Sequence, residues 1–167
     1  KATEHLIKNG CKRIAFLSIS QKLSISNMRL KGYLDALEKN KIKKDNTLIV
    51  SCEKDDAKNN SLIRKLLKRK NRPDSIFASV EKLAIATYTI CVELKLNIPK
   101  DIKVITFSNS YTAPFLNPSL TTITQPAFEI GRGAAGILFK MIEKKGHHFL
   151  QQKTVLNSVL VERNSTK

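Results

Sequence analysis

Short apolar runs alternate along the chain with longer segments in which apolar residues recur every three or four positions. The short runs, rich in Ile, Val and Phe, predict strands at residues 13–18, 47–51, 75–80 and 103–107. The longer segments predict helices at residues 1–9, 27–40, 60–70 and 82–96. Such alternation is typical of a parallel sheet whose right-handed crossovers place helices on both faces. We therefore expect an open, Rossmann-like α/β lobe.

The pattern changes after residue 107, where three prolines punctuate an irregular stretch. One short β-branched run, residues 120–124, lies within it, and we interpret it as a segment that crosses to another part of the fold. A helix at residues 128–144 and a last strand at residues 154–161 follow. Two interpretations of these last elements remain open: they belong to a second lobe whose other strands lie outside this sequence, or they cap the first sheet.

The first residues already show helical spacing, at Ala2, Leu6 and Ile7. No capping Ser, Thr, Asp or Asn stands ahead of them. We therefore expect the sequence to begin inside a helix of a longer protein.

A chain of 167 residues with 41% hydrophobic residues can bury a core without disulfides or a metal. No apolar run approaches the ~20 residues of a membrane span. The cysteines, Cys11, Cys52 and Cys91, are far apart and form no C-x-x-C pair. We expect reduced thiols, no metal and no cofactor, and we interpret His147 and His148 as part of a solvated connector.

Charge is concentrated in one part of the chain, which carries 30 Lys and Arg against 14 Asp and Glu, a net charge of +16. Residues 39–72 hold 12 basic and four acidic side chains, half of that net charge. A basic patch favours nonspecific phosphate binding, but this stretch contains no Phe, Tyr or Trp for base stacking. It is either a solvated face of a Lys-rich chain or a nucleic-acid-binding module.

A G-x-G-x-x-G string occurs at Gly131, Gly133 and Gly136. As a dinucleotide-binding fingerprint it would form the turn between a strand and a helix, but here the glycines fall inside a helical pattern. We expect them to allow close helix packing instead. The sequence has no G-x-S-x-G elbow and no phosphate-binding loop, and it predicts no enzyme.

Ligands of open α/β sheets bind beyond the carboxyl ends of the strands, where loops and helix N-termini converge. The candidate ligand-binding residues at such ends are Arg29 after the first strand, Glu81 after the third, Ser108 and Asn109 after the fourth, and Gln125 at the end of the crossing segment. An arginine beside amides and hydroxyls suits a neutral polyhydroxylated ligand or a carboxylate. The alternative is local: an ion pair for the arginine, and a turn at residues 108–109.

Seven segments, in order along nearly the whole chain, resemble the effector-binding domain of the LacI/GalR (lac repressor) family of bacterial transcriptional regulators. They are "HLIKNGCKRIAFL", "RLKGYLDAL", "PDSIFASVEKLAIA", "NIPKDIKVITFSN", "NPSLTTITQP", "EIGRGAAGILFKMI" and "LVERNST". In this family a helix-turn-helix headpiece and a hinge helix precede two lobes of the periplasmic binding protein type I kind, which close on a sugar or nucleobase.

The resemblance implies a division of this chain into parts of that domain. Residues 1–119 would form the C-terminal lobe, residues 120–126 a crossover, and residues 127–167 the last helix and strand of the N-terminal lobe. Operator DNA would be bound through a headpiece that is absent from this chain. The resemblance further implies a cytoplasmic homodimer with a small-molecule effector, a carbohydrate, and no membrane association. A periplasmic sugar-binding protein of a transporter shares this architecture and is the alternative.

Arg29 matches the effector-contacting arginine of the family, and Gln125 matches a glutamine that borders the pocket. Ser108 stands where an aspartate commonly binds the ligand, and Val80 stands where an asparagine often does. These two departures remove a bidentate acceptor and an amide, so an ordinary hexose is a poorer fit.

In the family the region after the fourth strand contributes to dimerisation. The resemblance therefore predicts dimer contacts at Tyr111, Phe115 and Leu116, the last two as exposed apolar anchors.

Overall fold

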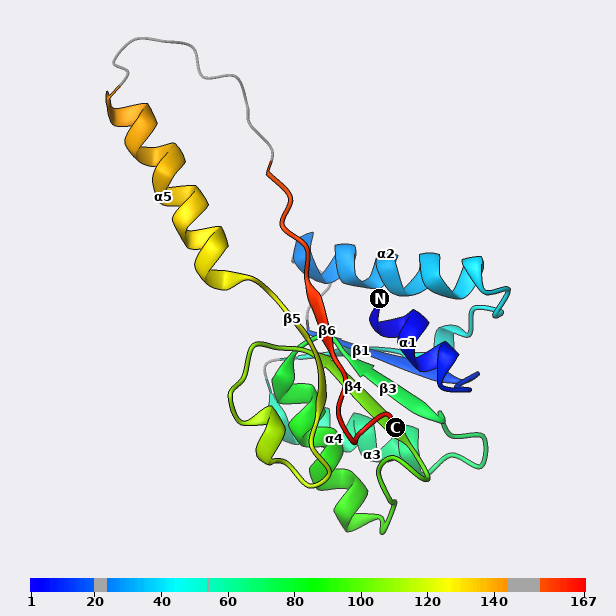
Figure 1. The fold of residues 1–167 in the computed structure, drawn as a ribbon. Helices are drawn as coiled ribbons and strands as arrows, with labels where there is room; N and C mark the ends of the chain where they lie inside the picture. The colour runs from blue at the N-terminus through cyan, green and yellow to red at the C-terminus, as the bar shows by residue number, and fades with distance from the viewer. Residues whose placement is uncertain (20–23, 54, 144–153) are drawn as a thin grey trace.

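The computed structural model describes residues 1–19, 24–53, 55–143 and 154–167. Its strands form a six-stranded sheet in the order β2-β1-β3-β4-β5-β6 (Figure 1). The strands are β1 (Ile14–Ile19), β2 (Ile49–Cys52), β3 (Ser75–Ala78), β4 (Lys103–Phe107), β5 (Thr121–Thr124) and β6 (Val159–Val161). Strands β1 to β5 pair in parallel, and β6 pairs antiparallel with β5. The four predicted strands are confirmed as β1 to β4, and the α/β fold class is confirmed.

Helices cover both faces of the sheet. They are α1 (Ala2–Lys8), α2 (Ser24–Lys39), α3 (Asp56–Leu67), α4 (Glu81–Glu93) and α5 (Ala127–Glu143), with short 3-10 turns η1 (Asn46–Leu48) and η2 (Ala113–Phe115). Apolar residues of α1 and α2 pack on one face, and those of α3 and α4 pack on the other. The four predicted helices of the lobe are therefore confirmed as α1 to α4.

Strand β1 shows why the central strands are apolar throughout. Successive side chains of a strand point to opposite faces, and here both faces are covered by helices. Phe16 packs toward α2, where its ring stacks on Tyr33 with the centroids 5.2 Å apart. Its neighbours Ala15 and Leu17 lie in the core on the α3–α4 face. Tyr33 also donates a hydrogen bond from its hydroxyl to the Ile14 carbonyl, at 2.9 Å.

The end of the chain differs from the prediction. The predicted crossing segment at residues 120–124 contains β5, which lies inside the sheet, and the last strand is the three-residue β6 at its edge. Beyond β6 the chain returns to the first lobe: the Val104 amide donates to the Ser165 carbonyl at 3.0 Å, and Thr166 is fully buried. Assigning all of residues 127–167 to a second lobe is therefore wrong for β6 and the residues after it.

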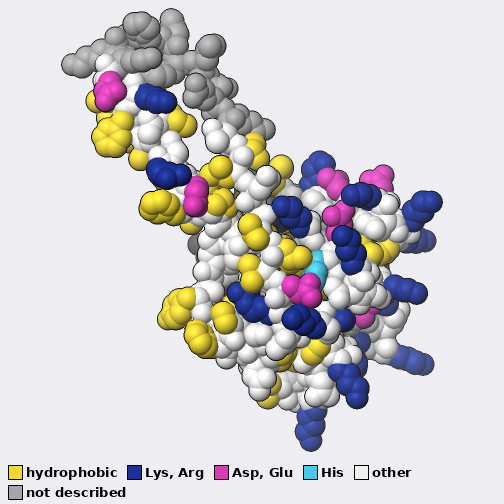
Figure 2. All heavy atoms as spheres, viewed as in Figure 1, with side chains coloured by type: hydrophobic (Ala, Val, Ile, Leu, Met, Phe, Trp, Pro, Cys, Tyr) yellow, Lys and Arg dark blue, Asp and Glu magenta, His cyan; other side chains and the backbone are white. Residues whose placement is uncertain are grey.

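Helix α5 stands away from the body of the molecule (Figure 1), and none of its residues is buried. Apolar side chains lie along its length (Figure 2), among them Phe128 and Phe139. A Cβ placed on Gly131, Gly133 or Gly136 would meet nothing within 4 Å, so the close packing expected there is not made by the described residues. These glycines also lie within the helix rather than at its start, so the geometry of a dinucleotide turn is absent from this helix.

The remaining expectations concern thiols, histidines and membranes. All three cysteines are buried free thiols, and burial raises the pKa of Cys52 and Cys91 to about 11. His147 and His148 lie outside the described residues. Across the described part of the chain, no helix has the length and apolar character needed to cross a membrane, and no three His, Cys, Asp or Glu side chains gather as a metal site.

Candidate functional site

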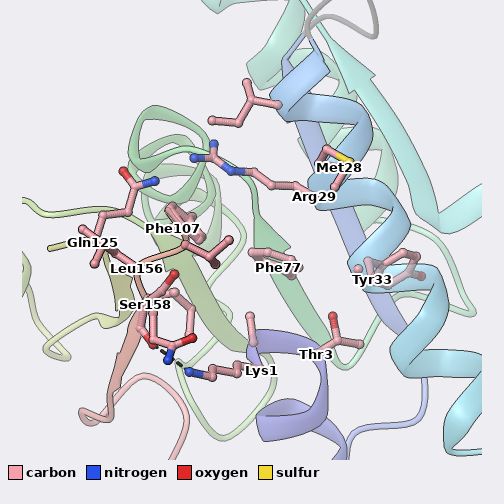
Figure 3. A pocket seen from close by; sticks show the side chains of 16 residues that line it. Lys1, Thr3, Met28, Arg29, Tyr33, Phe77, Phe107, Gln125, Leu156 and Ser158 are labelled. Atoms are coloured by element: carbon pink, nitrogen blue, oxygen red, sulfur yellow. Dashed lines mark hydrogen bonds between the residues drawn. The ribbon is translucent and has the colours of Figure 1, made fainter. Parts of the chain in front are cut away.

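A cavity of ≈ 450 Å³ lies between α2, the start of α1, the carboxyl ends of β4 and β5, and residues 155–158 (Figure 3). Two residues predicted from the sequence, Arg29 and Gln125, line it. Three aromatic side chains, Tyr33, Phe77 and Phe107, also contribute to its wall. The cavity thus combines aromatic surface with a guanidinium and an amide at the predicted edge of the sheet.

Arg29 lies in the second turn of α2, one turn later than predicted, because the helix begins at Ser24. Its Nη1 donates a hydrogen bond to the Ser79 carbonyl at 2.7 Å, and its guanidinium carbon lies 4.1 Å from the centre of the Phe107 ring. These contacts tie α2 to the ends of β3 and β4. Burial lowers the pKa of Arg29, but a guanidinium stays charged at any physiological pH.

The guanidinium of Arg29 is therefore held in place while most of its N–H donors remain free of protein partners among the described residues. Ser79 is the one hydrogen-bond acceptor that it meets among the described residues, and a guanidinium has five N–H donors in a planar fork. The attraction to the face of Phe107 also holds the guanidinium in place. The other N–H groups are left to meet a ligand with hydroxyl, carboxylate or phosphate oxygens.

Gln125 follows β5 and is positioned by Asn109. The backbone N–H of Gln125 donates a hydrogen bond to Asn109 Oδ1 at 2.6 Å, and Asn109 Nδ2 donates one to the backbone carbonyl of Gln125 at 2.7 Å. This reciprocal pair fixes the backbone of Gln125, whose side chain lies near Arg29 and Phe107 in Figure 3. Asn109 itself does not line the cavity.

Glu81 and Ser108 lie at the same edge of the sheet, but they form a hydrogen bond with each other and do not face the cavity. Ser108 Oγ donates to Glu81 Oε2 at 2.9 Å, and Thr112 Oγ1 donates to Glu81 Oε1 at 3.3 Å. Glu81 is the first residue of α4, where the helix dipole stabilises a negative charge. The carboxylate thereby ties the loop after β4 to α4, and neither residue lines the cavity.

Val80 precedes α4, and its side chain packs against the core on the α3–α4 face. All six candidate ligand-binding residues lie at the carboxyl edge of the sheet, and two of them, Arg29 and Gln125, line this cavity.

Sequence reasoning missed the aromatic wall and the chain segment opposite it. Phe107 ends β4, so its place at the carboxyl edge follows from the strand prediction itself. For residues 155–158 no sequence pattern indicates a place at the cavity, because only the antiparallel return of the chain toward β6 brings them there. Ser158 is held there by Lys1, whose Nζ donates to the Ser158 carbonyl at 2.7 Å. No Asp or Glu of the described residues lines the cavity.

Two of the three predicted dimer contacts are exposed and the third is not. Tyr111 and Phe115, in the loop between β4 and β5, are 83% and 81% exposed. Leu116 is half-buried and packs against the core on the α3–α4 face, so its prediction as an exposed anchor is wrong.

The chain is similar to known proteins over its full length. A model of the periplasmic binding protein-like domain matches residues 3–166. The HTH-type transcriptional regulator MalR of Clostridium butyricum is 31% identical over 165 residues, which are 99% of this chain and 48% of MalR. The chain therefore spans about half the length of this relative.

Solved structures agree with this match. A regulatory protein of the LacI family from Chloroflexus aggregans has a TM-score of 0.90 and 28% identity, with 99% of this chain and 59% of that chain covered. The transcriptional regulator CelR in complex with cellobiose has a TM-score of 0.87 and 28% identity, with 98% of this chain and 49% of that chain covered. The chain therefore belongs to the periplasmic binding protein-like domain family, in the form found in LacI-type transcriptional regulators.

Proposed function

We propose that this chain binds a small-molecule effector of the carbohydrate class as part of a LacI-type regulator. The observation that carries the proposal is the convergence of Arg29 and Gln125, far apart in sequence, on one cavity walled by Phe107. A pocket with an apolar wall and a few fixed polar groups is typical of small-molecule sites. A sugar ring offers an apolar face for the aromatic rings and hydroxyls for the guanidinium and amide. The cellobiose complex of a relative supports the same class.

In this proposal the effector closes two lobes on each other. Helix α5 is the part of the described chain that would belong to the N-terminal lobe, since all of its residues are exposed here. A headpiece outside this chain would bind operator DNA. An effector shifts the equilibrium between open and closed arrangements only through its different affinity for the two, so the closed form must add contacts beyond those of Arg29 and Gln125.

The regulator acts, in this proposal, as a cytoplasmic homodimer without catalytic activity. Tyr111 and Phe115 support the dimer, because large exposed aromatic side chains are typical anchors of protein interfaces.

A thermal-shift screen of the whole regulator tests the effector site. Monosaccharides, disaccharides, sugar phosphates and nucleobases are each added to the wild-type protein and to an Arg29→Ala variant. A ligand at 100 times its Kd stabilises the folded state by about 2.7 kcal/mol, which raises the melting temperature measurably. Arg29→Ala should abolish the shift. Lys31→Ala is the matched control, because Lys31 is an exposed cation of the same helix that pairs with Asp35. An Arg29→Ala protein that keeps the full shift contradicts the site.

A further inference from the structure

The edge of the sheet opposite the cavity is strongly basic. Four segments that each lead from a helix into a parallel strand meet at this amino edge: residues 8–13, 38–47, 65–74 and 93–103. They contain 15 Lys and Arg against five Asp and Glu, which is +10 of the net charge of +16. By contrast, the described residues of the loops at the carboxyl edge, 24–29, 52–58, 79–82 and 108–116, carry three basic and four acidic side chains. We call the four segments the basic rim.

The segments of the basic rim form one continuous surface. Arg13 Nη2 donates to the Asn71 carbonyl at 3.1 Å and pairs with Asp45 at 3.4 Å, which joins three of the segments. Arg72 pairs with Asp101 at 3.9 Å and joins the fourth. Figure 2 shows the result: Lys and Arg side chains gather on the right and lower sides of the body, where α1 turns into β1 in Figure 1.

Acidic side chains of the basic rim are engaged in local structure. Asp45 accepts hydrogen bonds from Thr47, and Asp74 accepts from the backbone amides of Lys12 and Arg13. Ten lysines are exposed and form no side-chain hydrogen bond or ion pair among the described residues: Lys8, Lys12, Lys41, Lys43, Lys44, Lys65, Lys68, Lys70, Lys95 and Lys100. The positive charge of these ten lysines therefore faces solvent without an ion pair among the described residues.

We propose that the basic rim binds the phosphate backbone of duplex DNA without reading its sequence. A row of uncompensated cations supplies the electrostatic affinity, because each phosphate contact releases a condensed counterion. The four segments contain no Phe, Tyr or Trp, which single-stranded nucleic acids require for stacking. Protein interfaces are depleted of Lys and depend on aromatic or Arg anchors, and the three arginines of the rim are already engaged: Arg13 and Arg72 pair with aspartates, and Arg69 donates to the Thr47 carbonyl. An acidic protein therefore fits less well. The rim consists of helix ends and loops and presents no element that would enter a groove and read base edges.

This surface lies at the opposite edge of the sheet from the effector cavity, and the proposal does not depend on ligand binding there. A second, nonspecific contact would keep the effector domain close to DNA and raise its local concentration near the duplex.

The test measures binding of the 167-residue chain to a fluorescent 20-base-pair duplex of arbitrary sequence between 50 and 200 mM salt. A contact with about four phosphates gives a slope of log Kd against log salt near 3.6, so affinity should fall about 100-fold over this range. The variant Lys43→Gln/Lys44→Gln/Lys68→Gln/Lys70→Gln should bind at least tenfold more weakly at 50 mM salt, with a slope lower by about 2. The control Lys31→Gln/Lys58→Gln/Lys82→Gln/Lys140→Gln removes the same charge away from the rim and should retain both affinity and slope within twofold. Melting temperatures confirm that both variants are folded.

Three outcomes would overturn the proposal. Equal loss of affinity in the two variants would show that binding follows net charge rather than the rim. Equal or tighter binding of a single strand of the same length would indicate another class of nucleic acid. Displacement of the duplex by poly-glutamate at the same charge concentration would indicate a general preference for acidic chains.

Discussion

His5 joins the two ends of the chain through a buried polar network. Its Nε2 lies 2.8 Å from Thr166 Oγ1, which in turn lies 2.8 Å from Thr121 Oγ1. All three residues are buried, so the network holds α1, β5 and the C-terminal segment together within the core. A buried network of this kind stabilises the fold only while each member keeps its partner.

Acid should therefore destabilise the chain through His5. Burial lowers the pKa of His5, despite a nearby Glu162, below its unfolded value of about 6.5. The unfolded state then takes up the proton first, so the free energy of unfolding is highest above pH 6.5 and falls as the pH drops from there toward the folded pKa. Thermal unfolding between pH 7.5 and 5 should show a steeper loss in the wild-type chain than in His5→Gln, which cannot titrate. Parallel pH profiles of the two proteins would contradict this prediction.

Helix α3 illustrates how local sequence sets the start of an element. Asp55 precedes the helix, and its Oδ1 accepts hydrogen bonds from the amides of Ala57 at 2.9 Å and Lys58 at 3.2 Å. These amides belong to the first turn, where the helix cannot supply acceptors of its own. The helix then packs Ile63, Leu66 and Leu67 against the sheet.

Removal of this cap should destabilise the chain. Asp55→Ala is expected to lower the free energy of unfolding by about 1 kcal/mol, because two first-turn amides lose their acceptor. Asp56→Ala is the matched control: this neighbouring carboxylate forms an exposed ion pair with Lys82, an interaction worth at most about 1 kcal/mol and usually less. Urea unfolding of both variants provides the measurement. A larger loss for Asp56→Ala would contradict the assignment of the cap.

Helix α5 differs from α3 in its packing, because nothing in the described chain covers its apolar side chains. Phe128→Ser and Phe139→Ser should leave the melting temperature of the 167-residue chain unchanged, since these residues are 74% and 63% exposed. In the whole regulator, where α5 is proposed to pack within the N-terminal lobe, Phe139→Ser should lower the melting temperature by several degrees. Equal melting temperatures for the variant and wild-type regulators would contradict that packing.

Across the chain as a whole, the cavity and the basic rim are separated in space. The cavity lies at the carboxyl edge of the sheet, the basic rim lies at the amino edge, and Tyr111 with Phe115 projects from the loop between β4 and β5. Parallel topology produces the first two, because it gathers all strand ends of one kind at one edge. The proposed effector site and the proposed nucleic-acid surface therefore lie at opposite edges of the sheet.

The proposed dimer can be tested on the whole regulator. Tyr111→Ser combined with Phe115→Ser should raise the dimer dissociation constant at least tenfold, since truncating a single interface hot spot costs about 2 kcal/mol or more. Val92→Ser is the control, because Val92 is 79% exposed on α4, away from this loop. Sedimentation velocity at several concentrations measures the equilibrium. An unchanged dissociation constant in the double variant would place the dimer contact elsewhere.

Much of the first lobe follows from the sequence alone. Strands β1 to β4 and helices α1 to α4 were predictable because each carries a local signal: continuous apolar runs for strands buried on both faces, and apolar stripes for the helices. The carboxyl-edge location of Arg29, Glu81 and Gln125 follows from the same pattern, since parallel strands order their ends without any knowledge of side-chain contacts.

Tertiary structure alone decided which of those residues face the cavity and where the last residues of the chain pack. Glu81 and Ser108 form a hydrogen bond with each other, while Arg29 is held by the Ser79 carbonyl just after β3 and by the Phe107 ring at the end of β4. Strand β6 and the buried Ser165 return to the first sheet through partners more than 30 residues away. These outcomes depend on which polar groups meet in space, and hydrogen bonds between distant segments leave no periodic pattern in the sequence.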